Sequence, residues 1–541
     1  MDRTPSFNAK NRVETIQSVT SDIYDLIIIG GGITGGGILL DASSRGIKTL
    51  LVEKSDFGAG TSGRSTKLIH GGLRYLKNFE FRLVRETGRE RTILFKNAPH
   101  LVIPEKLMIP LTKKGNFKKW QLSWALKIYD HLAGVKEVDK RQILNRKSTL
   151  NKEPLLDSIN LLGAGLYAEY RTDDARLTLE VIKTALKYNG IALNYSEVID
   201  TKKTNGVFHL ICTDNLTNKK FELKAKSVIN ATGPWVDELC KMDLKESSNK
   251  ICLSKGIHIV INKNKLPLNH PIYFEVEDGR MCFAIPRDKV TYIGTTDTAY
   301  SGNKNEPTIN IKDINYLINA VNNTFNINAI NKSDIISSWS GLRPLIKKEG
   351  ISTKELSRKD EISISKTGMI TIAGGKLTGY RIMAKKIVDL ICKKQKIHKK
   401  CVTDTIKING GDLNNKSIKG FNTLVSDILK KLKIDNYNSK YLISNYGIQT
   451  ELILDLFKSN NFKHLVEAEV VFCLNNENLH NPLDFFLRRT GKIYFYTENV
   501  LQELELVMPH FINFLSLNEN EANQMKQNVE EYLKNLTNFS E

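Results

Sequence analysis

The segment "YDLIIIGGGITGGGILLDASSRGIKTLLVE", residues 24–53, constrains the fold of this chain most strongly. Its apolar run Leu26–Ile29 is typical of a strand buried on both faces. Glycines follow in GxGxxG spacing, before a predicted helix and a second apolar strand. Such glycines permit a tight turn, close approach to a pyrophosphate and close helix–strand packing, and an acid after the second strand can bind ribose hydroxyls. The segment therefore predicts a dinucleotide-binding βαβ unit that uses Gly30, Gly32, Gly35 and Glu53.

Two later segments favour FAD over a nicotinamide cofactor. "KSVINATGPWVDEL" and "GMITIAGGKLTGYRIMAKKIVDLI" each place small residues directly after a short predicted strand. No second complete glycine fingerprint occurs downstream, so both segments are interpreted as further approaches of the chain to one FAD. The helix N-terminus in the second segment could stabilise negative charge on a reduced flavin. The predicted contacts are Ala231, Thr232, Gly233, Gly374 and Gly375.

The stretch "TSGRSTKLIHGGLRYL", residues 61–76, combines hydroxyls, cations, a histidine and two adjacent glycines. Hydroxyls can bind flavin phosphates or ring edges without adding charge, and paired glycines allow the backbone to approach a flat ring. The stretch therefore predicts more cofactor contacts, namely Thr61, Ser62, Ser65, Thr66, Lys67, His70, Gly71 and Gly72.

These motifs, with "LYAEYRTDDARL", "KGIHIV", "IGTTDTAY", "SGLRPL" and "EAEVVFCLNNENLHNPLDFFLRRT", occur in an order that resembles the FAD-dependent, aerobic-type glycerol-3-phosphate dehydrogenases. The resemblance implies an α/β fold: a two-dinucleotide-binding-type FAD domain, an antiparallel-sheet substrate domain and a C-terminal helical cap. It also implies oxidation of sn-glycerol 3-phosphate to dihydroxyacetone phosphate by hydride transfer to flavin N5, with electrons passed on to a membrane quinone.

The reaction implied by this resemblance needs a phosphate clamp and a base for the substrate's C2 hydroxyl. The planar guanidinium of Arg343 suits bidentate phosphate binding. His258 is the first candidate for the base, because a neutral imidazole has a suitable pKa and the resemblance places it on the substrate side of the flavin. His70 is the competing candidate. The predicted supporting substrate contacts are Arg74, Tyr75, Lys376 and Arg381. Asp174 or Asp297 could orient a basic side chain, but carboxylates at strand ends also cap helices, so neither is assigned a catalytic role.

The pattern along the chain predicts four regions. Residues 1–22 form an N-terminal extension, and residues 23–110 with parts of 160–250 and 355–400 form the FAD-binding domain. Residues 111–159 and 251–350 form a substrate-binding roof, because apolar and polar positions alternate in 251–350. Residues 405–541 change to helical periods and are expected to form a separate helical domain.

A net charge of +20 and a Trp/Lys-rich helical pattern within residues 113–141 favour association with an anionic membrane surface. Trp120, Trp124 and Ile128 recur at helical spacing there, although an ordinary core helix with a basic cap would show the same pattern. Scattered cysteines and the lack of a signal sequence favour a cytoplasmic protein, peripheral at the inner face of the cell membrane. No nucleic-acid-binding motif or metal-ligand cluster is found in the sequence, and a homodimer is left open.

Three alternatives stay open on the sequence alone. Related enzymes pass electrons to oxygen, although they tend to carry an insertion in the substrate domain that is not seen here. A flavin amine or amino-acid oxidase of the same superfamily would need a carboxylate clamp instead of a phosphate clamp. A catalytically silent FAD protein could bind membranes or nucleic acid through its positive charge.

Overall fold

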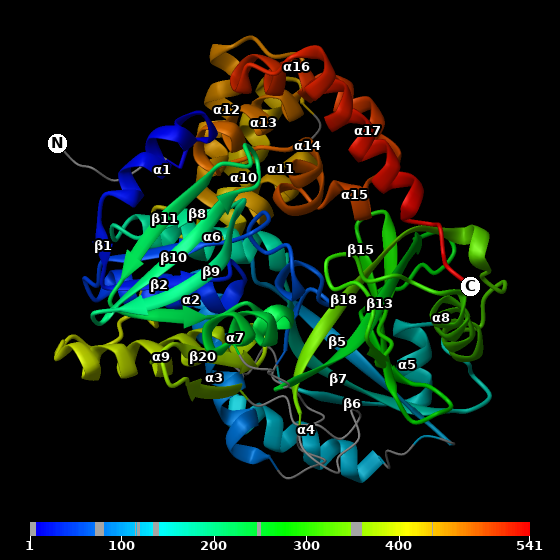
Figure 1. The fold of residues 1–541 in the computed structure, drawn as a ribbon. Coiled ribbons are helices and arrows are strands. Elements are labelled where there is room, and N and C mark those ends of the chain that lie inside the picture. Colours follow the sequence, from blue (N-terminus) through cyan, green and yellow to red (C-terminus); the bar gives the residue numbers. More distant parts are fainter. Residues whose placement is uncertain are drawn as a thin grey trace.

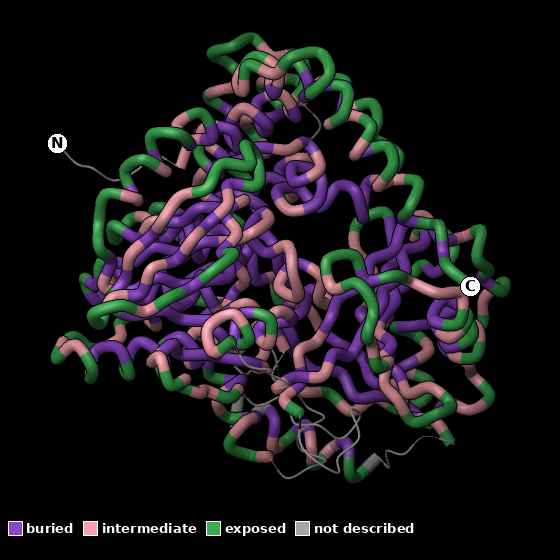
Figure 2. The backbone as a smooth tube through the Cα atoms, viewed as in Figure 1, coloured by how far each residue is buried: buried purple, intermediate pink, exposed green. Residues whose placement is uncertain are grey.

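The computed structural model describes residues 7–70, 80–113, 115, 119–133, 140–245, 250–347, 360–434 and 437–541. Three regions are evident in Figure 1: a sheet with flanking helices, a second large sheet beside it, and a helical region that adjoins both. Figure 2 shows that buried backbone is concentrated in the two sheets and in the interior of the helical region.

A six-stranded, mostly parallel sheet forms the first region, and only β19 runs antiparallel to its neighbour. Its strands, in spatial order, are β19 (Asp360–Ile364), β20 (Ile370–Gly374), β12 (Val228–Asn230), β2 (Leu26–Ile29), β3 (Thr49–Val52) and β8 (Ile191–Leu193). Leu26 and Ile28 belong to a core shared with helices α2 (Ile33–Ser44), α6 (Asp174–Leu186) and α9 (Tyr380–Gln395). The predicted βαβ unit is confirmed.

A smaller sheet covers the other face of the six-stranded sheet. Ile27 and Ile29 of β2 pack there, which explains why this strand is apolar at every position. The small sheet contains β1 (Ile23–Tyr24), β11 (Lys220–Ala225), β10 (Val207–Asp214) and β9 (Ser196–Thr204). Helix α1 (Arg12–Thr20) lies beside it, and the buried Arg12 guanidinium donates to Asp214 at 2.7 Å. The described part of the predicted N-terminal extension is therefore packed against the domain.

The second region is a ten-stranded sheet, here called the roof sheet. Its strands are β17 (Thr298–Tyr300), β13 (Ile251–Asn262), β16 (Val290–Gly294), β15 (Met281–Arg287), β14 (Ile272–Glu275), β5 (Ile103–Thr112), β7 (Leu161–Arg171) and β4 (Leu68–Ile69), with β18 (Ile335–Ile346) beside β13 and β6 (Gln142–Asn145) beside β7. Helices α5 (Arg146–Lys152) and α8 (Ile311–Thr324) pack against it. All strand pairs in it are antiparallel except β5 with β14, so the predicted antiparallel roof is confirmed in its main feature.

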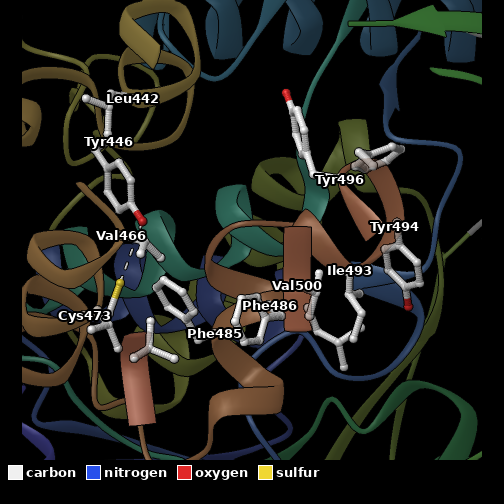
Figure 3. Packing of buried hydrophobic residues seen from close by; sticks show 14 of the residues in the cluster. Leu442, Tyr446, Val466, Cys473, Phe485, Phe486, Ile493, Tyr494, Tyr496 and Val500 are labelled. Carbon is white, nitrogen blue, oxygen red and sulfur yellow. Dashed lines mark hydrogen bonds between the residues drawn. The ribbon is translucent and has the colours of Figure 1, made fainter. Parts of the chain in front are cut away.

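The C-terminal region is helical, as expected. Its α-helices are α10 (Ile418–Lys431), α11 (Tyr437–Tyr446), α12 (Thr450–Ser459), α13 (Leu465–Asn476), α14 (Pro482–Asp484), α15 (Lys492–Phe495), α16 (Val500–Leu515) and α17 (Glu519–Asn535). Figure 3 shows part of its apolar core, to which Phe485, Phe486, Ile493, Tyr494 and Val500 belong. This core continues into the roof sheet through Tyr292 and Trp339, so the two regions share one packed interior.

The sheets cross one of the domain boundaries predicted from sequence. β4 and most of β5 fall within residues 23–110, predicted as part of the FAD-binding domain, yet both belong to the roof sheet with β7. An apolar pattern identifies a strand without identifying its partners, so the pattern could not show that the chain crosses early to the roof. Three further α-helices complete the description: α3 (Phe81–Asn97), α4 (Lys119–Ala133) and α7 (Val236–Leu244).

Candidate functional site

A cavity of about 670 Å³ lies between the six-stranded sheet and the roof sheet, within the range of cofactor sites. Most of the residues that the sequence singles out line it, although they come from elements far apart in the chain. They are Gly30, Gly32, Glu53, Thr61, Ser62, Ser65, Thr66, His70, Ala231, Thr232, Gly233, His258, Arg343, Gly374, Gly375 and Lys376.

The β2–α2 turn forms one wall of the cavity, and its geometry fits a dinucleotide. Gly30 has φ +114°, and a Cβ there would lie 2.5 Å from the carbonyl oxygen of Ala231. The Ser62 hydroxyl accepts from the Ile33 amide at 2.9 Å, at the start of helix α2. Backbone N–H groups at a helix N-terminus favour phosphate. The lack of side chains at the turn therefore leaves room for the backbone to approach a pyrophosphate.

Glu53 follows β3 at the same end of the cavity. Its carboxylate accepts from the Gly31 amide at 2.6 Å and from the Ser55 amide at 2.9 Å. Burial raises the pKa of Glu53, and these two hydrogen bonds oppose the rise. The carboxylate is thus held at the turn, where the predicted ribose contact requires it.

The third glycine element approaches the cavity from the end of β20. Gly374 and Gly375 have φ +77° and +84°, values that other residues rarely adopt. Lys376 follows them and lines the cavity. The Thr378 hydroxyl donates to the carbonyl of His70 at 3.2 Å, which joins this element to the stretch after residue 61.

His258 lies in β13, at the roof side of the cavity. Its Nε2 is 3.0 Å from the Thr66 hydroxyl, and its ring stacks on Trp339 with a centroid distance of 4.6 Å and an interplanar angle of 10°. Gly294 in the neighbouring strand makes room for this ring, since a Cβ there would lie 2.1 Å from its Cδ2. Burial, the Arg343 charge and the Lys67 charge together hold the pKa of His258 well below 6.5. The imidazole is therefore neutral, as a general base must be.

Arg343 lies in β18 and is held by the residues that follow β16. Its guanidinium donates to the Thr295 hydroxyl at 2.8 Å and to the Thr296 carbonyl at 3.1 Å, and it lies 3.5 Å from Asp297. The guanidinium lies over Gly256 of β13, where a Cβ would be 2.3 Å from Nη2. Glycine at this position therefore allows the guanidinium to lie against the roof sheet.

Replacing Gly256 by alanine is expected to shift the Arg343 guanidinium. The KM for an anionic substrate that Arg343 binds should rise about tenfold or more, with little loss of stability. The nearest atoms are ends of side chains, namely the Arg343 guanidinium and the Thr295 hydroxyl, so the backbone need not move. A well-placed charged hydrogen bond contributes about 1.5–3 kcal/mol. Thermal unfolding and steady-state kinetics check the two halves of this prediction, and an unchanged KM would contradict it.

Three of the predicted residues in the described part of the chain do not line the cavity. Gly35 is in α2, where a Cβ would lie 1.9 Å from the Gly30 carbonyl, so its role is helix packing. The buried ammonium of Lys67 bonds Asp174 at 2.5 Å. Arg381 binds Glu90 of α3 through two hydrogen bonds of 2.5 and 2.7 Å. Lys67 and Arg381 thus gain no support as direct ligand contacts, because each is committed to an ion pair.

Four predicted residues, Gly71, Gly72, Arg74 and Tyr75, lie outside the described residues. Of the two acids that could orient a basic side chain or cap a helix, Asp174 binds Lys67 and Asp297 lies beside Arg343.

Sequence reasoning missed several residues that shape the site. Thr295 anchors Arg343, Trp339 stacks on His258, and Gly256 and Gly294 make room for the two functional side chains. The glycines had a detectable signal, because glycine inside a strand marks close approach by another group. Trp339 had none, since its position opposite His258 depends on the pairing of β13 with β18.

Comparison with known proteins shows the family of the chain. Residues 25–381 match the family described as FAD dependent oxidoreductase, and residues 401–522 match the C-terminal domain of alpha-glycerophosphate oxidase. The chain is 44% identical over 522 residues to an aerobic glycerol-3-phosphate dehydrogenase of Staphylococcus saprophyticus, with 93% of each chain covered. It is 43% identical over 532 residues to one of Staphylococcus aureus, with 96% of each covered.

A solved structure shows the same architecture. The glycerol-3-phosphate dehydrogenase from Bacillus halodurans, complexed with FAD, superposes with a TM-score of 0.83 at 36% identity, covering 98% of this chain and 99% of that chain. The FAD-dependent family match confirms the predicted cofactor. The chain therefore belongs to the FAD-dependent oxidoreductases and, within them, to the aerobic glycerol-3-phosphate dehydrogenase family.

Proposed function

We propose that the protein oxidises sn-glycerol 3-phosphate to dihydroxyacetone phosphate and passes the electrons to a membrane quinone. The observation that carries this proposal is the pairing of a neutral histidine, His258, with an arginine, Arg343, on adjacent strands at the roof side of the cavity. The relatives named aerobic glycerol-3-phosphate dehydrogenase supply the substrate class.

The residues divide into three tasks. Glu53 and the glycine turns hold the dinucleotide, and the flavin of FAD, when bound, supplies the two-electron acceptor. Arg343 and Lys376, which both line the cavity, bind the substrate phosphate. His258 takes the proton of the C2 hydroxyl, because its imidazole is neutral and faces the same cavity.

A simple anaerobic experiment tests the substrate. Purified holoenzyme is mixed with sn-glycerol 3-phosphate, and the flavin absorbance near ~450 nm is followed. Rapid bleaching supports the proposal. A flavin that stays oxidised at millimolar substrate would refute it and would direct attention to amino acids and amines.

The exposed side chains of helix α4 support the proposal that the electron acceptor lies in a membrane. Trp120 and Trp124 are 63% and 61% exposed, whereas Leu122 and Leu126 on the opposite side are buried. Interfacial helices carry exposed tryptophans in this way, and the net charge of +20 favours anionic lipid. Within the described ranges, none of the helices has the length and apolar character needed to span a bilayer. On the exposed tryptophans and the net charge, we propose that α4 binds the inner face of the cell membrane.

Replacing Trp120 and Trp124 together by serine is expected to weaken binding to anionic vesicles about tenfold or more. On binding, each tryptophan transfers a large apolar surface from water into the lipid interface, and burial of such a side chain is worth about 1.5–3 kcal/mol. Vesicle co-sedimentation measures the loss, with the exposed Leu452 and Leu501 replaced by serine as the matched control. Oxygen consumption by the enzyme in the absence of quinone would favour an oxidase over a quinone-linked dehydrogenase. Equal vesicle binding by both double variants would refute the role of α4.

A further inference from the structure

Trp339 is the closest aromatic partner of the candidate base. It stands opposite His258 in the antiparallel pairing of β13 with β18, and the two rings are nearly parallel at 4.6 Å. The indole is 3% exposed and does not line the cavity. Its influence on the reaction must therefore pass through His258 and the backbone next to it.

The His258 ring has few polar restraints. Its Nε2 lies 3.0 Å from the Thr66 hydroxyl, and among the described residues its buried Nδ1 has no hydrogen-bond partner. One hydrogen bond fixes a direction without fixing the tilt of a ring. Stacking on Trp339, opposite the space left by Gly294, supplies the missing restraint.

Trp339 also holds the backbone that carries Thr66. Its Nε1–H donates to the carbonyl of Ser65 at 3.2 Å, and the Tyr292 hydroxyl donates to the carbonyl of Thr66 at 3.2 Å. Ser65 and Thr66 both line the cavity. The indole therefore stacks on His258 and hydrogen-bonds the peptide carbonyl that precedes Thr66, the hydrogen-bond partner of His258.

The C-terminal region supports the indole from behind. The rings of Tyr494 and Phe495 lie 5.1 and 5.9 Å from Trp339, and the Ser337 hydroxyl in β18 donates to the Tyr494 carbonyl at 2.7 Å. Tyr494 is seen in Figure 3 within the apolar core of the helical region. Trp339 thus connects the apolar core of the helical region with His258, the candidate base.

We propose that Trp339 is a positioning residue that fixes the plane of the His258 imidazole, and that it makes the C-terminal helical region part of the catalytic apparatus. This inference rests on the proposed role of His258. Since a displacement of about 1 Å in a reacting group can slow a reaction about 100-fold, loss of the stack should appear in the chemical step.

The test compares Trp339→Leu with Trp339→Phe in FAD-loaded enzyme under anaerobic stopped flow. Leucine removes the stack and the Nε1–H donor, whereas phenylalanine keeps a ring that can stack. We expect W339L to slow flavin reduction about tenfold or more at saturating glycerol 3-phosphate, with the substrate dissociation constant within about threefold of wild type. W339F should recover most of the rate. Phe325→Leu, in the roof core away from the cavity, controls for the loss of a buried aromatic ring.

Several results would overturn the proposal: a wild-type rate in W339L, equal defects in W339L and W339F, or a rate loss that tracks loss of bound FAD. Trp339→Met keeps apolar volume without a ring, and it replaces W339L with the same criteria if that variant does not fold. Failure of the wild-type enzyme to reduce its flavin with glycerol 3-phosphate would refute the proposed function instead. The two failures are therefore distinguishable.

Discussion

Replacement of His258 by glutamine is expected to slow reduction of the bound flavin by glycerol 3-phosphate about 100- to 10,000-fold, the range that a positioned general base contributes. Glutamine can still bond the Thr66 hydroxyl and fill much of the space, but it cannot accept the C2 hydroxyl proton at neutral pH. FAD content and the substrate dissociation constant should stay close to wild type. Anaerobic stopped flow, with bound FAD measured after denaturation, gives these quantities.

His209→Gln is the matched control, because His209 lies in β10 of the small sheet, bonds Glu222 and does not line the cavity. Its rate should equal that of wild type. A reduction rate in H258Q within a few-fold of wild type would remove His258 from the role of base. His70, which also lines the cavity, would then be the next residue to replace.

The buried state of His258 also predicts a pH dependence. The unfolded chain takes up a proton on this histidine near pH 6.5, whereas burial and the Arg343 charge hold the folded pKa well below that value. The free energy of unfolding is therefore unaffected by this group above pH 6.5. It falls progressively as the pH drops from 6.5 toward the pKa of the folded state. The wild-type reduction rate should show no inflection near pH 6.5 from this group. H258Q should lose less stability than wild type between pH 7 and 5.

Most of the residues predicted to contact the cofactor line one cavity in the structure, and the signals that identified them are local. The turn after β2 needs glycines within a few residues of each other, and the acid that serves it follows the next strand. The ATG and GG elements likewise come directly after strands of the same sheet. Each signal reflects backbone geometry that only certain residues can adopt, so it is visible without knowledge of the tertiary structure.

The substrate end could be predicted only in part because it depends on strand pairing. His258 and Arg343 were recognised from their motifs, but the contacts that hold them come from β16, β18 and the helical region. Lys67 and Arg381 gain no support from the structure as ligand contacts. Their motifs adjoin the cavity, but their partners, Asp174 and Glu90, lie more than 100 residues away in the chain. A cation near a motif cannot be assigned to a ligand until its buried partners are known.

Arg343 is the side chain whose replacement tells most about the identity of the substrate. Replacing it by methionine is expected to raise the dissociation constant for glycerol 3-phosphate about 30-fold or more, since truncating one partner of a desolvated charge pair costs about 2–5 kcal/mol. Methionine keeps much of the side-chain stem but removes all five donors. Arg343→Lys should recover only part of the affinity, because an ammonium cannot reproduce the planar fork that binds two phosphate oxygens.

Glycerol, which lacks the phosphate, provides the internal control. If Arg343 binds the phosphate, wild type and R343M should oxidise glycerol at equally low efficiency, and the penalty should appear only with glycerol 3-phosphate. If R343M instead loses activity equally with both substrates, the guanidinium acts on the reacting carbon or on His258, whose pKa it helps to depress. Thr295, Thr296 and Asp297 hold the guanidinium in place, so contacts within the protein set its orientation. That preorganisation is the physical reason to expect the larger penalty with the phosphorylated substrate.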